Sequence, residues 1–92
     1  MSTKQEEHRR AEPEASERRS LEAAVSESVM HDLGRPAGLH HVQSRRVFGD
    51  NYRVNVFVGA DAASAKVAHS FFVAADADGK VVESTPAITR RY

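Results

Sequence analysis

The pattern of this chain changes abruptly near Gly34. Before that point, hydrophobic residues recur at spacings of three and four, which is typical of a helix with one buried side. From Leu39 to Ser84, strand-like runs alternate instead with turn residues. A helix followed by a run of strands predicts an α+β fold, in which one N-terminal helix packs on a four-stranded antiparallel meander.

The expected helix begins between Pro13 and Ser20 and ends before Gly34. Gly34 stands where a left-handed residue commonly closes a helix, and Pro36 follows two positions later. The helical spacing predicts a buried stripe that consists of Leu21, Ala24, Val25, Val29 and Leu33.

Four strands are expected, bounded by Gly, Asp and Asn turn residues, at 39–48, 52–58, 66–75 and 80–84. If a three-residue loop joins the first two strands, Phe48 lies opposite Tyr52 and Val42 opposite Val58. A two-residue loop would instead pair Val47 with Val54. We favour the three-residue loop because it places hydrophobic partners together on one face.

Alternation along these strands assigns side chains to two faces. The face toward the helix is expected to carry alternate residues of strand two from Tyr52 to Val58, and Val67, His69, Phe71 and Val73 of strand three, with Val82 opposite Val73. The other face is expected to carry Arg45, Arg53, Asn55, Phe57, Ser70 and Phe72. Its two Phe rings need a cover, which either the tail residues Ile88 and Tyr92 or a second subunit could supply.

Composition predicts a short leader and one domain. Residues 1–19 contain ten charged residues and no Val, Ile, Leu, Phe or Tyr. We therefore expect a disordered leader at 1–14 and a single α+β domain at 15–92. The chain has no Cys, no apolar run long enough for a membrane span, and zero net charge. These features favour a cytoplasmic protein without membrane contact.

No catalytic, metal-binding or phosphate-binding motif stands out. Zinc would need three or four converging ligands, and the adjacent His40 and His41 of a regular strand point to opposite faces, so that only one could join His69. We therefore expect no metal, no cofactor and no enzymatic activity.

The leading hypothesis is a non-enzymatic interaction domain that forms a homodimer or binds another protein. Its interaction face would carry Arg45, Arg53, Phe57 and Phe72. One alternative is a weak module for RNA or single-stranded nucleic acid that uses Arg45, Arg46 and Arg53. A second alternative is a small ligand binder or enzyme with a pocket near His69.

Overall fold

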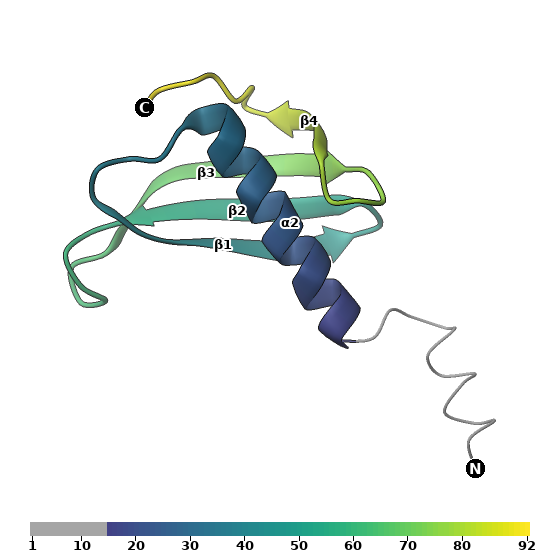
Figure 1. Cartoon of the computed structure of the whole chain (residues 1–92), viewed down its shortest axis with the longest axis horizontal. Helices are drawn as coiled ribbons and strands as arrows, with labels where there is room; N and C mark the ends of the chain where they lie inside the picture. The colour runs from purple at the N-terminus through teal and green to yellow at the C-terminus, as the bar shows by residue number, and fades with distance from the viewer. Residues whose placement is uncertain (1–14) are drawn as a thin grey trace, which may run out of the picture.

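The fold is one helix on a four-stranded sheet, as the sequence predicts. The computed structural model describes residues 15–92, so the predicted disordered leader at 1–14 lies outside the described residues. The elements in chain order are α2 (Ala15–Leu33), β1 (Leu39–Phe48), β2 (Asn51–Val58), β3 (Lys66–Ala75) and β4 (Val81–Thr85). The strands pair antiparallel in the order β1-β2-β3-β4 (Figure 1). Within the described part of the chain, no helix has an apolar stretch that could span a bilayer.

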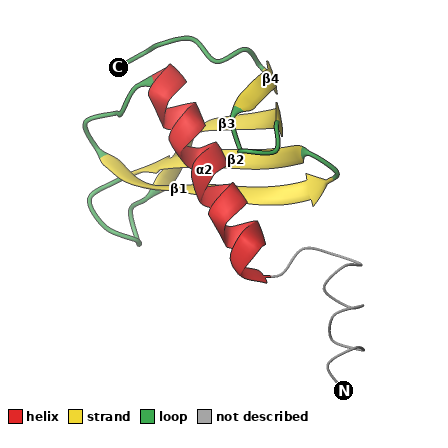
Figure 2. Ribbon diagram, turned by 45° about the vertical axis from the view of Figure 1, so that its right-hand side comes forward, coloured by secondary structure: helices red, strands yellow, loops and turns green. Residues whose placement is uncertain are grey.

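The core lies between α2 and one face of the sheet, which the helix crosses diagonally (Figures 1 and 2). Val25, Val29 and Leu33 of α2 are almost completely buried, which confirms the central part of the predicted stripe. The buried cluster consists of Val25, Val29, Leu33, Tyr52, Val54, Val56, Phe71, Val73 and Ala75. Each large side chain in this cluster contributes about 1.5–3 kcal/mol by leaving water, so the helix is held mainly by this contact.

The C-terminal segment closes the end of α2. Gly34 has a φ of +92°, and its N–H donates to the carbonyl of Met30 at 2.8 Å. The carbonyl of Leu33, the last residue of α2, accepts the N–H groups of Arg91 at 2.8 Å and Tyr92 at 3.2 Å. A Cβ at position 34 would lie 2.8 Å from the carbonyl carbon of Tyr92. Glycine is therefore required here both for its backbone angle and for the close approach of the tail.

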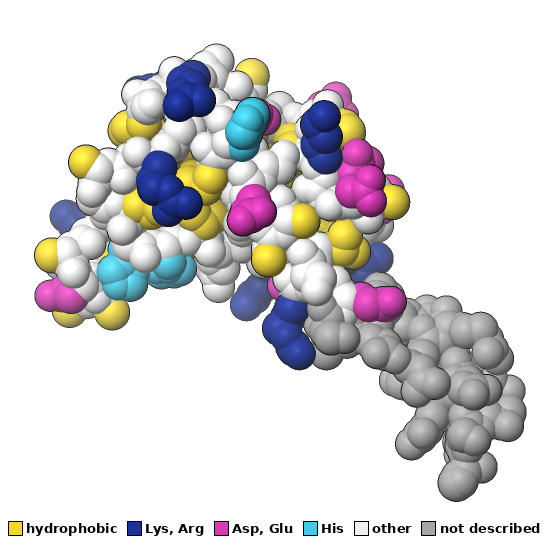
Figure 3. Space-filling view, in the orientation of Figure 1, with side chains coloured by type: hydrophobic (Ala, Val, Ile, Leu, Met, Phe, Trp, Pro, Cys, Tyr) yellow, Lys and Arg dark blue, Asp and Glu magenta, His cyan; other side chains and the backbone are white. Residues whose placement is uncertain are grey.

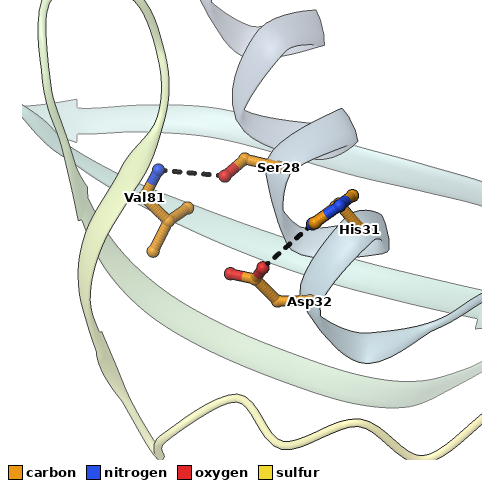
Figure 4. A network of polar contacts seen from close by, with 4 residues as sticks. All are labelled: Ser28, His31, Asp32 and Val81. Carbon is orange, nitrogen blue, oxygen red and sulfur yellow. Dashed lines mark hydrogen bonds and ion pairs between the residues drawn. The ribbon is translucent and has the colours of Figure 1, made fainter.

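The turn between β3 and β4 packs directly on α2. Gly79 has a φ of +84°, and a Cβ there would lie 2.5 Å from the Cβ of Ala24. The carboxylate of Asp76 accepts two backbone N–H groups inside the turn, each at 2.9 Å. The N–H of Val81 donates to Oγ of Ser28 at 3.0 Å (Figure 4). The predicted glycine turn is confirmed, and it also ties β4 to the helix.

The predicted register between β1 and β2 was wrong. The turn has two residues, Phe48 pairs with Asn51, and a register shift leaves Val47 unpaired. Val42 consequently lies opposite Val56 instead of Val58, which keeps it on the helix side. Phe48 is not opposite Tyr52; beyond the bulge its ring turns to the other face and is 62% exposed.

Register shifts also change the predicted faces of two valines. Between Val56 and Phe57 the pairing shifts, so that Val67 lies opposite Phe57, is 50% exposed and does not join the core. A further shift, between Ala74 and Ala75, leaves Val82 of β4 as the extra residue. Val73 therefore lies opposite Ser84, and Val82 is 66% exposed. Both valines had been assigned by strict alternation, which fails wherever one strand carries an extra residue.

The substitution Val29→Asp should unfold the domain, because an unpaired carboxylate at this buried position costs several kcal/mol. Thermal unfolding followed by circular dichroism measures the effect. Ala23→Asp is the matched control, since it puts the same charge on an exposed position of the same helix. Equal melting curves for the two variants would contradict the assignment of Val29 to the core.

Burial raises the pKa of the Tyr52 hydroxyl above its ordinary value of 10.0, while Arg46 opposes the shift. The unfolded chain therefore ionises first, and stability should fall as the pH rises through 10.0 and beyond. Tyr52 and Tyr92 are the two tyrosines of the chain. In a Tyr92→Phe variant, phenolate absorbance should appear at higher pH in the folded chain than in urea. Coincident titration curves would contradict the burial of Tyr52.

Candidate functional site

The sheet face opposite α2 is not covered by any element of residues 15–92. Cross-strand pairs arrange its side chains in rows. One row consists of His41, Phe57 and Val67, and another consists of Arg45, Arg53 and Phe72. We call this surface the open face, and it consists of His41, Gln43, Arg45, Phe48, Arg53, Asn55, Phe57, Val67, Ser70, Phe72, Ala74 and Glu83.

All four residues predicted for an interaction face belong to the open face. Arg45 pairs with Arg53, and Arg53 in turn pairs with Phe72. The guanidinium carbon of Arg53 lies 5.6 Å from the centre of the Phe72 ring, a distance that permits a cation–π contact. Phe57 belongs to a separate row, one strand spacing away from Val67.

Neighbouring rings partly shield both Phe side chains. Phe57 stacks on His41 with a centroid distance of 4.3 Å and an angle of 7° between the planes. Phe72 lies 6.3 Å from the Phe48 ring. Phe57 and Phe72 are each half-buried as a result, whereas Phe48 remains largely exposed. Sequence reasoning missed Phe48 because the register shift between Arg46 and Phe48 turns its ring to this face. It missed His41 because the expected register, with Val42 opposite Val58, does not place His41 opposite Phe57.

A polar row separates these two aromatic groups. Oγ of Ser70 donates to Oδ1 of Asn55 at 2.7 Å, and Nη1 of Arg53 reaches Oγ of Ser70 at 3.5 Å. These side chains are already hydrogen-bonded within the chain, so they can be buried against a partner with few further hydrogen bonds. The open face therefore presents two apolar areas, around Phe57 and around Phe72, on either side of a satisfied polar strip.

The C-terminal segment does not cover the open face. Ile88 packs against the buried cluster on the helix side. The hydroxyl of Tyr92 is hydrogen-bonded to Nε2 of His69 at 2.8 Å, and His69 stacks beside Phe71 of the core face. The tail thus docks, but on the side of the sheet away from Phe57 and Phe72.

Arg46 does not join Arg45 and Arg53. It lies opposite the buried Tyr52, and its backbone N–H donates to Oε2 of Glu22 at 3.2 Å. Its Nε donates to the carbonyl of Gly49 at 2.8 Å. Of the three arginines considered for nucleic-acid binding, only two share the open face.

The histidines do not form a metal site in the described part of the chain. Within residues 15–92 there is no group of three His, Asp or Glu side chains that could hold a metal ion. The register shift at His40 brings its Nδ1 to 2.7 Å from Nδ1 of His41. The prediction that these rings point apart was therefore wrong, because a bulge abolishes alternation at that point.

Neither of two prominent hollows on the described surface is lined by His69. The larger lies between α2 and the start of β1, and the smaller is near Tyr52. Sequence reasoning did not anticipate the larger hollow, because its walls come from α2 and the start of β1, and no sequence motif indicates that these two segments form a site together.

Comparisons with known proteins gave no match to a protein-family model, to a curated protein or to a solved structure.

Proposed function

We propose that this protein is a non-enzymatic, cytoplasmic interaction domain that forms a symmetric homodimer through its open face. The observation that carries the proposal is the presence of three Phe rings on a sheet face that no described element covers. Exposed apolar surface of this kind usually marks an interaction site in a soluble domain. The sequence allowed the tail residues Ile88 and Tyr92 to cover these rings. The tail docks on the opposite side instead, so it does not cover them.

One two-fold symmetric arrangement places each row of the open face over the same row of a second copy. In this arrangement the open faces of two copies stack on each other, and the two-fold axis lies between them, parallel to the strands. β2 of one copy then lies over β3 of the second copy, and β1 lies over β4. Phe57 then faces Val67, and Arg53 faces the Phe72 ring of the second copy. Each contact occurs twice because the interface is symmetric, so two apolar pairs and two cation–π pairs form together.

Charge supports the same arrangement. Arg45 and Arg53 lie side by side, which is unfavourable unless a negative group is near. Glu83 of β4 carries the negative charge of the open face, and it belongs to the row next to Thr85 and Phe72. Laying β1 over β4 brings Arg45 of each copy toward Glu83 of the other.

The size of the face indicates a weak dimer. A sheet of four strands spaced about 4.8 Å apart and about eight residues long covers roughly 500 Å² in projection. A stable interface of standard size buries about 800 Å² of accessible surface on each partner. Since Phe57 and Phe72 are already half-buried, the further burial of each contributes about half of the full 1.5–3 kcal/mol. We therefore expect a dissociation constant in the micromolar range.

The double variant Phe57→Ser and Phe72→Ser should be a folded monomer, because it removes the apolar surface that association would bury. Sedimentation velocity over one concentration series, with circular dichroism as a check of folding, compares it with the natural chain. Val82→Ser is the matched control, since it removes an exposed apolar side chain that has no partner in the rows of the open face. A natural chain that stays monomeric at several hundred micromolar would overturn the proposal.

A charge exchange tests the arrangement without touching the rings. Arg45→Glu alone and Glu83→Arg alone should each weaken the dimer, because each places like charges across the interface. The two substitutions together should restore association to near the original strength. Additive weakening in the double variant would exclude the arrangement of β1 over β4.

The adjacent Arg45 and Arg53, with Phe57 and Phe72 as stacking surfaces, also favour a second function, the binding of single-stranded nucleic acid. The anisotropy of a labelled oligonucleotide should then rise with protein concentration and fall steeply with added salt. Arg46→Gln is the control, because this side chain lies off the open face. Failure of binding at low salt would leave the homodimer as the function to pursue.

A further inference from the structure

A groove of about 560 Å³ lies between the C-terminal half of α2 and the first residues of β1. It opens because α2 crosses the sheet diagonally and leaves the start of β1 uncovered (Figure 1). The groove is lined by Ser26, Glu27, Met30, His31, Arg35, Leu39, His40, His41 and Val42. Figure 3 shows hydrophobic side chains beneath a basic side chain in this region, with His side chains beside them.

The floor of the groove is apolar. Met30, Leu39 and Val42 are half-buried hydrophobic residues that pack against the core cluster and still face the groove. The core behind them gives the floor a fixed shape. A volume of about 560 Å³ falls within the range of small-molecule sites, which is about 300–1,000 Å³.

The rim carries a positive group with no partner. Within residues 15–92, Arg35 takes part in no hydrogen bond or ion pair. Its guanidinium keeps all five N–H donors free beside an apolar floor, and it suits a carboxylate because the planar fork can give two parallel hydrogen bonds. His31 has a different partner, the carboxylate of Asp32 at 3.3 Å (Figure 4).

The pair of His40 and His41 adds a further hydrogen-bond donor. A distance of 2.7 Å between the two Nδ1 atoms requires one ring to donate and the other to accept. When both rings are neutral, the accepting ring carries its hydrogen on Nε2. One Nε2–H is thereby available at the rim for an anionic oxygen.

We propose that this groove binds a small molecule with one carboxylate and a compact apolar body. The carboxylate would pair with Arg35 and accept the free Nε2–H of the histidine pair, while the apolar body would lie on Met30, Leu39 and Val42. Glu27 stands at the same rim and disfavours a ligand with several negative charges. The floor of this site lies on the helix side of the sheet, and His41 is the lining residue that it shares with the open face.

Nuclear magnetic resonance titration of the full chain with hexanoate tests the proposal. Amide signals of Met30, Arg35, Leu39 and Val42 should shift together in a saturable way. The matched probes are 1-hexanol, which lacks the charge, hexylamine, which reverses it, and inorganic phosphate, which lacks the apolar body. Hexanoate should bind about three- to fivefold tighter than 1-hexanol, the ratio that an exposed ion pair gives.

The variant Arg35→Gln should remove the preference for hexanoate over 1-hexanol and leave the fold intact, because Arg35 is exposed. Arg53→Gln is the control, since it removes the same charge from the open face, and it should bind hexanoate as the natural chain does. Equal binding of hexanoate and 1-hexanol, or an unchanged preference in Arg35→Gln, would overturn the proposal. Shifts confined to the open face, around Phe57 and Phe72, would also overturn it.

Discussion

The packing of three side chains of α2, Val25, Val29 and Leu33, on the valines of β2 and β3 holds this small domain together. The described core has nine residues, and the chain has no Cys that could supply a disulfide. A core of this size leaves little stability to spare. The other features on the helix side, including the tail at Leu33 and the turn at Gly79, are contacts to the helix that this packing fixes in place.

Local signals explain why the architecture could be predicted. The spacing of Val25, Val29 and Leu33 indicates one buried side, and Gly34 marks the end of the helix in both sequence and structure. The register could not be predicted in the same way, because it depends on where a strand accommodates an extra residue. The bulges at Val47 of β1 and Ala68 of β3 follow from the packing of whole strands, and neither extra residue is a Gly that would have marked the position.

The same distinction applies to the candidate site. The pairing of β2 and β3 is regular in their central parts, from 53 to 56 and from 69 to 72. The sequence alternation therefore placed Arg53, Phe57 and Phe72 correctly on one face. Phe48 joined them only through the register shift at the end of β1, and His41 lies beside Phe57 only in the observed register of β1 and β2. The groove beneath Arg35 depends on the crossing angle of α2, which no short-range pattern encodes.

Irregular edges also limit how the sheet can grow. β1 has register shifts at both of its ends, and the backbone N–H of Arg46 is already taken by Glu22. β4, at the other edge, has five residues and begins beside a further shift in pairing. Short or bent edges of this kind are poor templates for an incoming strand. Both edges of the sheet therefore disfavour the lateral addition of a further strand.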